Sequence, residues 1–167
     1  MRSRAILLLT AALVVALDRW TKAWVRAHAV PGETFWHWGR VVAFTYVLNR
    51  GAAFGLFPNG TALFVVVAIG LLAAVVYLGA TRHHWAVSTA IGFGLLAGGA
   101  IGNLWDRLGA GEVVDFINLH WWPVFNVADS AIVVGMVLLV FEAWRRDSGD
   151  ARSGNTRSTS HNRRGAG

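Results

Sequence analysis

The sequence of 167 residues contains no cysteine. Disulfide frameworks, thiolate nucleophiles and cysteine-based metal sites are therefore excluded. Charged residues are also scarce, at 14% of the chain, whereas roughly 25% is usual in soluble domains. No His-x-Glu or His-Glu-x-x-His spacing occurs, so the sequence predicts neither a metal site nor a cofactor. With 55% apolar residues, the chain is expected to be a membrane protein of one domain.

Four apolar stretches have the length of a membrane span. A helix of about 20 residues spans about 30 Å, the thickness of the hydrocarbon core of a bilayer. The predicted helices cover about 5–26, 61–81, 85–105 and 126–145. The first could instead be a signal peptide, because Arg2 and Arg4 precede its apolar run. We expect a retained helix, because Ala27-His28-Ala29, the candidate cleavage site, lies too far behind that run.

Residues 30–57 are rich in aromatic and β-branched side chains, which favours strands over helix. Gly39-Arg40 is a candidate hairpin turn. The segment also contains amphipathic aromatic rings of the kind that settle at a membrane–water interface, namely Trp36, Trp38, Phe44 and Tyr46. The predicted fold is therefore an all-α integral membrane protein with four transmembrane helices and a small extracytoplasmic β-sheet, all within residues 1–147.

The basic residues predict the orientation of these helices, because lysine and arginine in short flanks favour the cytoplasmic side. With four spans, three basic flanks fall on one side, at Arg2 and Arg4, at Arg82, and at Arg145 and Arg146. Both termini are then cytoplasmic. Residues 148–167 are dominated by Ser, Arg, Gly and Asn, which predicts a disordered basic cytoplasmic tail. Because six of the 15 basic residues lie in the last 23 positions, at such a flank, we expect no nucleic-acid partner despite the net charge of +6.

Two aspartates lie among apolar residues: Asp115, in the expected outer loop, and Asp129, near the start of the fourth span. A carboxylate at mid-membrane costs roughly 2.5–3.5 kcal/mol, so a carboxylate near lipid is a candidate for function. Two such residues within reach of each other predict an aspartyl pair that activates water.

Further polar residues reach the same expected depth from separate segments, and each set has a simpler interpretation. Asp18 and Lys22 could be only a helix ion pair, and Asn126 with Asp129 could be a capped helix start. Asp106 and Arg107 could be a loop ion pair. Near these residues, Gly94, Gly98 and Gly102 recur every four positions, as in closely packed helices. Glu142, close to the inner end of the fourth span, is expected only to reach the interface.

The polar residues fall in five short blocks. The blocks are Asp18-Arg19-Trp20-Thr21-Lys22, Asn49-Arg50-Gly51-Ala52-Ala53-Phe54, Gly99-Ala100-Ile101-Gly102-Asn103-Leu104-Trp105-Asp106-Arg107, Val113-Val114-Asp115-Phe116 and Phe125-Asn126-Val127-Ala128-Asp129. In this order they resemble the motifs of the lipoprotein signal peptidase family (signal peptidase II), with Ile101 where leucine is common. The resemblance covers roughly residues 5–145 and omits the tail and the tryptophan-rich stretch 36–38.

The resemblance implies a membrane aspartic endopeptidase that removes the signal peptide from diacylglyceryl-modified prolipoproteins, cutting before the lipidated cysteine. Asp115 and Asp129 would be catalytic and would share one proton, which the sequence does not assign to either. The supporting and substrate-binding residues would be Asp18, Lys22, Asn49, Gly51, Asn103, Asp106, Arg107 and Asn126. No metal or cofactor is implied.

The resemblance also implies a place for the protein, the bacterial cytoplasmic (inner) membrane, with the active site near the outer leaflet. The expected partners are the lipidated prolipoprotein and membrane phospholipid, and we expect a monomer. The main alternative is a small transporter or channel subunit that uses the buried acids as an ion path. A presenilin-type protease is a third interpretation, but its Gly-x-Gly-Asp block does not occur.

Overall fold

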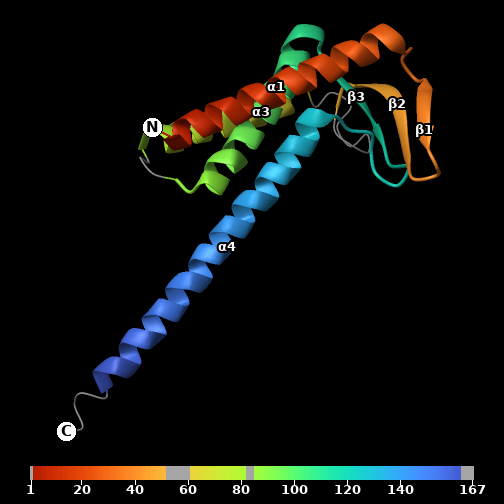
Figure 1. The fold of residues 1–167 in the computed structure, drawn as a ribbon. Coiled ribbons are helices and arrows are strands. Elements are labelled where there is room, and N and C mark those ends of the chain that lie inside the picture. The colour runs from red at the N-terminus through yellow and green to blue at the C-terminus, as the bar shows by residue number, and fades with distance from the viewer. Residues whose placement is uncertain (1, 52–60, 82–84, 163–167) are drawn as a thin grey trace.

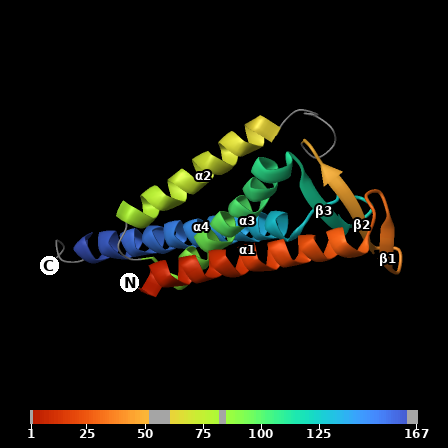
Figure 2. The ribbon, with the colours of Figure 1, turned by 90° about the horizontal axis from the view of Figure 1, so that it is seen from above.

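The computed structural model of the protein describes residues 2–51, 61–81 and 85–162 (Figure 1). In chain order, the elements are α1 (Arg2–His28), β1 (Thr34–Trp38), β2 (Val42–Asn49), α2 (Thr61–Thr81), α3 (Val87–Ala110), β3 (Val113–Asn118) and α4 (Val127–Asn162). The sheet lies at one end of the helices, and the first turn of α1 lies at the other end (Figure 2). The fold is therefore mostly helical, with a small sheet beside one set of helix ends.

Helix α3 packs against α1, α2 and α4 and is the centre of the helical part. Its glycines make the close packing possible. A Cβ atom added at Gly98 would lie 2.7 Å from Cβ of Val14 and 2.8 Å from the carbonyl oxygen of Ala11. Without a side chain, α3 can bring its backbone against α1. The predicted role of Gly94, Gly98 and Gly102 in helix packing is thus confirmed.

Three helices among the described residues are long and apolar enough to cross a membrane, namely Thr61–Thr81, Val87–Ala110 and Val127–Arg146. The mean hydropathy of an 18-residue stretch in each helix is 2.7, 1.4 and 1.9 respectively. These helices fit the second, third and fourth predicted spans. Helix α1 is longer than the predicted 5–26 and has 27 residues. Its second half is strongly polar, with Asp18, Arg19, Lys22 and Arg26.

The sheet is antiparallel, with the strand order β1-β2-β3. Strands β1 and β2 form the predicted hairpin, in which Trp38 pairs with Val42 and Gly39 adopts a φ of 60° in the turn. Glycine adopts this left-handed conformation without steric cost. Residues 52–57 of the predicted β-rich segment lie outside the described residues.

The third strand corrects the prediction that Asp115 lies in a loop, because Val113–Asn118 pairs with β2. Residues Val113 to Phe116 are buried on both faces of the strand, so the polar–apolar alternation that marks a half-exposed strand is absent. The partner strand is also more than 60 residues earlier in the chain. Both facts hide β3 from a reading of local sequence pattern.

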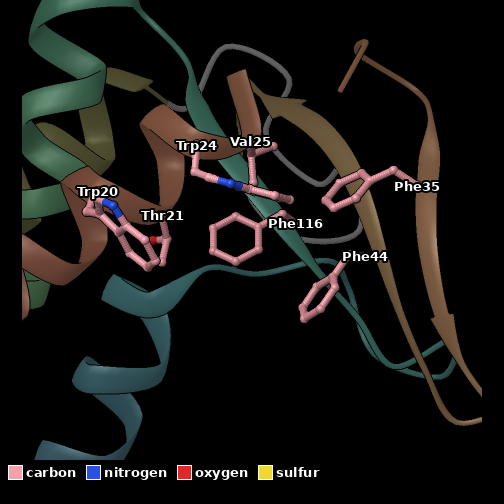
Figure 3. A pocket seen from close by; sticks show the side chains of 7 residues that line it. All are labelled: Trp20, Thr21, Trp24, Val25, Phe35, Phe44 and Phe116. Atoms are coloured by element: carbon pink, nitrogen blue, oxygen red, sulfur yellow. The ribbon is translucent and has the colours of Figure 1, made fainter. Parts of the chain in front are cut away.

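An apolar cluster joins the sheet to the end of α1. Val25, Tyr46, Val114 and Phe116 are its buried members. A cavity of about 190 Å³ lies beside this cluster (Figure 3), and its walls are Trp20, Thr21, Trp24, Val25, Phe35, Phe44 and Phe116. Because successive residues of a strand point to opposite faces, Phe116 faces this cavity while Asp115 faces the other side of the sheet.

Two helix ends differ from the predictions. Helix α3 continues to Ala110 rather than ending near 105, so Asp106 and Arg107 are helical and not in a loop. Helix α4 continues to Asn162, although the sequence predicts a disordered tail from residue 148. A helix propagates more readily than it nucleates, so α4 extends into polar residues that would not start a helix on their own.

Candidate functional site

Asp115 lies in the middle of β3 with only 2% of its surface exposed. The β2–β3 register places Val47 opposite Asp115. Asn49, two residues further along β2, therefore points to the same face as Asp115. Asn49 donates from Nδ2 to Oδ2 of Asp115 at 2.9 Å, and Asn126 donates from Nδ2 to Oδ1 at 2.7 Å. Both carboxylate oxygens of Asp115 thus accept an amide hydrogen bond.

Asp129 lies in the first turn of α4, where it forms a reciprocal cap with Asn126. The backbone N–H of Asp129 donates to Oδ1 of Asn126 at 2.9 Å, and the backbone N–H of Asn126 donates to Oδ2 of Asp129 at 3.2 Å. This pair satisfies helix donors that have no partner within the helix. The simpler interpretation of these two residues, a capped helix start, is confirmed, and it coexists with a place in the site.

Asn103 of α3 links the two aspartates through its amide. Its Nδ2 donates to Oδ1 of Asp129 at 2.6 Å, and its Oδ1 accepts from Nδ2 of Asn126 at 3.1 Å. Since Asn126 also donates to Asp115, a chain of two amides connects one carboxylate to the other. The structure therefore brings together the two aspartates and the two asparagines that the sequence singled out.

A group of buried charged side chains lies against these two amides. Lys22 and Asp18 are both fully buried, and Nζ of Lys22 lies 2.8 Å from Asp18, 2.9 Å from Asp106 and 3.1 Å from Oδ1 of Asn103. Asp18 also accepts the backbone N–H of Ala128 at 3.1 Å. Asp18 and Lys22 are therefore more than a surface ion pair, because they connect α1 to α3 and to the start of α4.

Asp106 pairs with α1 rather than with its neighbour Arg107. Besides Lys22, it accepts hydrogen bonds from Arg19 and Arg26, the latter at 3.0 Å. The predicted supporting residues do not include these two arginines. They are seven residues apart, which places them on one face of α1, and this spacing is the signal that could have found them.

Arg107 and Gly51 complete the predicted set. The Arg107 guanidinium lies over the ring of Phe64 in α2, 4.8 Å from its centre, and both aspartates act on it electrostatically. The backbone N–H of Gly51 donates to Oδ1 of Asn49 at 3.0 Å. Gly51 thereby turns Nδ2 of Asn49 toward Asp115.

The surroundings of Asp115 favour its protonated form near neutral pH. Burial raises the pKa of Asp115 to about 7, and the negative charge of Asp129 also raises it. Hydrogen bonds from Asn49 and Asn126 act in the opposite direction, as does the charge of Lys22. Desolvation is the largest of these effects. The site can therefore hold one protonated and one ionised carboxyl group, as acid–base catalysis requires.

A cavity of about 310 Å³ opens beside Asp129, which is half-buried. Its other walls are mostly apolar and comprise Leu119, Trp121, Trp122, Phe125, Ser130, Val133 and Val134. Across the part of the chain that the structure describes, no cluster of three or more potential ligands could hold a metal ion. The arrangement can thus bring an apolar chain to a pair of carboxyl groups.

Residues 10–145 match the family model of signal peptidase (SPase) II. The lipoprotein signal peptidase of Syntrophomonas wolfei is 50% identical over 128 residues, which cover 77% of this chain and 85% of that protein. The lipoprotein signal peptidase of Rhodococcus jostii is 44% identical over 144 residues, which cover 82% and 71%.

A solved structure supports the same relationship at the level of the fold. It is described as a bacterial membrane enzyme determined by the in meso method at 2.3 Å resolution, and it superposes with a TM-score of 0.80 at 31% identity. The superposition covers 86% of this chain and 90% of that chain. With a family model that covers most of the sequence and relatives of this similarity, the chain belongs to the signal peptidase II family.

Proposed function

We propose that the protein is an aspartic endopeptidase that removes the signal peptide from prolipoproteins, cutting before a cysteine that carries diacylglycerol. The family is one of proteases, and the relatives are named lipoprotein signal peptidases. The observation that carries the proposal for this chain is the pair Asp115 and Asp129, joined by Asn103 and Asn126, with the pKa of Asp115 raised to about 7.

The pair would act as a general acid and a general base. Asp129 lies in the first helical turn of α4, where the helix dipole favours negative charge. We assign it the ionised role, in which it takes a proton from water while the oxygen of that water attacks the scissile carbonyl carbon. Protonated Asp115 gives its proton to the carbonyl oxygen. When the tetrahedral intermediate collapses, Asp129 returns its proton to the leaving amine and Asp115 recovers one from the intermediate's hydroxyl group.

The remaining residues would hold this geometry. Asn103 and Asn126 would fix the two carboxyl groups, and Arg107, on which both aspartates act electrostatically, would orient the substrate backbone. Asp18, Lys22 and Asp106 secure the helix ends that carry those groups. Asn49 and Gly51 do the same from the sheet. The working unit would be a monomer.

For the membrane, we propose that α1 also spans it, as the first of four spans, and that both termini are cytoplasmic. A helix of 27 residues is about 40 Å long, more than the hydrocarbon thickness. In its polar half, Asp18 and Lys22 are buried against α3 and α4 at the site, which removes much of the cost of placing these two charges in a membrane. The sheet and the aspartates then lie near the outer leaflet, where diacylglycerol anchors the substrate cysteine.

The alternative of a transporter or channel subunit is not favoured. An ion path needs polar groups across the membrane. Residues 5–17, 61–81, 90–102 and 131–141, which form the middle parts of the four helices, contain no charged residue. The acids of the site therefore gather at one end of the helices, and no charged residues continue from them across the membrane.

The proposal is tested with the purified full chain and one precursor, prepared with and without diacylglycerol on its cysteine. Both forms are incubated at equal concentration in the same detergent, and the products are weighed by mass spectrometry. We expect cleavage directly before the cysteine in the lipidated form only, because the lipid holds the scissile bond at the depth of Asp115 and Asp129. Equal cleavage of both forms would contradict the proposed substrate.

A further inference from the structure

A further cavity, with both polar and apolar walls, lies at the other end of the helices. Its volume is about 250 Å³, and its walls come from α2, α3, α4 and the segment just before α3, namely Leu78, Trp85, Thr89, Phe93, Leu139, Glu142, Ala143 and Arg146. Thr89 precedes Asn103 by 14 residues in α3, and Glu142 follows Asp129 by 13 in α4. Both separations correspond to about 20 Å along a helix. The cavity is thus separate from the proposed active site.

Opposite charges line this cavity. Glu142 is only 6% exposed, although the sequence predicts that it merely reaches the interface. Arg145 donates to Oε2 of Glu142 at 3.1 Å from a side chain that is 62% exposed. Arg146 donates from Nη2 to Oγ1 of Thr89 at 3.0 Å. Glu142 and Arg146 are four residues apart and so lie on the same face of α4. The cavity therefore presents an acid and a base about one turn apart.

The other walls are apolar. Leu78, Phe93 and Leu139 come from three different helices, each of which is apolar enough to cross a membrane. Trp85, which belongs to a residue type typical of the membrane–water interface, also lines the cavity, with its ring centre 5.1 Å from that of Phe93. A ligand for this cavity must consequently carry both charged groups and a hydrocarbon part, in the order in which a membrane lipid carries them.

We propose that this cavity binds one phospholipid whose headgroup contains a phosphate and a primary ammonium, that is, a phosphatidylethanolamine. The phosphate would accept from the Arg146 guanidinium, of whose five N–H groups Thr89 accepts one. The ammonium would donate to Glu142, and an acyl chain would lie against Phe93 and Leu139. An anionic headgroup without an amine would leave Glu142 facing a like charge. A choline headgroup has no N–H to donate. The inference does not depend on the proposed peptidase function.

Native mass spectrometry of the full chain tests the proposal. Dioleoyl lipids with ethanolamine, choline or glycerol headgroups are added at equal concentration to the delipidated protein in detergent. We expect about tenfold tighter binding of the ethanolamine lipid than of the choline lipid, the effect of one charge-assisted hydrogen bond. The same headgroup without acyl chains, glycerophosphoethanolamine, should not displace the bound lipid, because it leaves the apolar walls unfilled.

Three variants connect the binding to the cavity. Glu142→Gln should lose the preference for ethanolamine over choline. Thr89→Val, which removes only the hydroxyl that positions Arg146, should weaken both lipids several-fold and keep their ratio. Arg4→Gln is the matched control, because Arg4 is an exposed arginine of α1 outside the cavity walls, and it should change nothing.

The proposal is overturned if the folded wild type binds the three lipids equally or prefers the glycerol lipid. It is also overturned if wild type and Thr89→Val bind the ethanolamine lipid alike, a comparison that stands even where Glu142→Gln fails to fold. Folding is checked for each variant by thermal unfolding in the same detergent.

Discussion

The hydrogen bond from Asn49 to Asp115 should set the alkaline limit of activity. Asn49 donates to Asp115 Oδ2 at 2.9 Å, and this bond lowers the pKa of Asp115 against the larger effect of burial. Asn49→Ala should therefore raise that pKa. A hydrogen bond to a charged group contributes about 1.5–3 kcal/mol, and one pKa unit corresponds to about 1.4 kcal/mol. Because water replaces part of the bond, we expect a shift of about one unit.

The assay is kcat/KM for a lipidated precursor as a function of pH, which reports ionisations of the free enzyme. In the wild type, activity should fall as pH rises through about 7, since Asp115 loses the proton that it donates. In Asn49→Ala the same fall should occur near pH 8, whatever the absolute rate. Asn118→Ala is the matched control. It removes an asparagine of the same sheet that donates to Thr45, not to an aspartate. An alkaline limit that stays in place or moves to lower pH in Asn49→Ala would refute the reasoning.

Three further predictions address the two catalytic carboxyl groups, cleavage without a metal ion, and the close packing of α3 at Gly102. Asp115→Asn and Asp129→Asn should each abolish cleavage by folded protein, since an amide cannot transfer the proton. Full activity in either variant would contradict the assignment of Asp115 and Asp129 as the catalytic pair. Cleavage should survive exhaustive chelation by EDTA or phenanthroline, and a reproducible loss that zinc restores would contradict the mechanism. Gly102→Ala should lower both the unfolding temperature and activity, because its Cβ would lie 2.6 Å from Oδ2 of the buried Asp18, a kind of overpacking that costs about 1–3 kcal/mol. Gly109→Ala, where a Cβ meets nothing within 4 Å, should be neutral; equal effects of both changes would show that Gly102 is not needed for close approach.

The helical part of the fold is readable from sequence because each span carries its own signal. The bounds of α2 agree with the predicted 61–81, because 21 consecutive uncharged residues identify a span without reference to any other segment. The hairpin of β1 and β2 is also local, with a glycine turn between two aromatic strands. Strand β3 is different, because its existence depends on pairing with β2 far earlier in the chain. Local pattern predicts elements, but it does not predict long-range pairings.

The site shows the same division between what is local and what is not. Order and spacing predict that Asp18, Lys22, Asn103 and Asp106 reach one depth, and they do meet. The sequence does not predict which acidic side chain forms an ion pair with which basic side chain. Asp106 pairs with α1 instead of its neighbour Arg107, because the glycines of α3 let that helix lie directly against α1. Pairing of charges is decided by helix packing, which depends on residues outside the polar blocks.

Lys22 has a role that follows only from the assembled contacts. The amide of Asn103 could in principle face either way. Its oxygen receives two donors, Nζ of Lys22 and Nδ2 of Asn126, each at 3.1 Å. Because both neighbours can only donate there, the oxygen must face them, and the nitrogen is left to donate to Asp129 at 2.6 Å. A buried cation on α1 thus determines which atom of α3 meets the carboxylate on α4, and the three helices hold Asp129 as one unit.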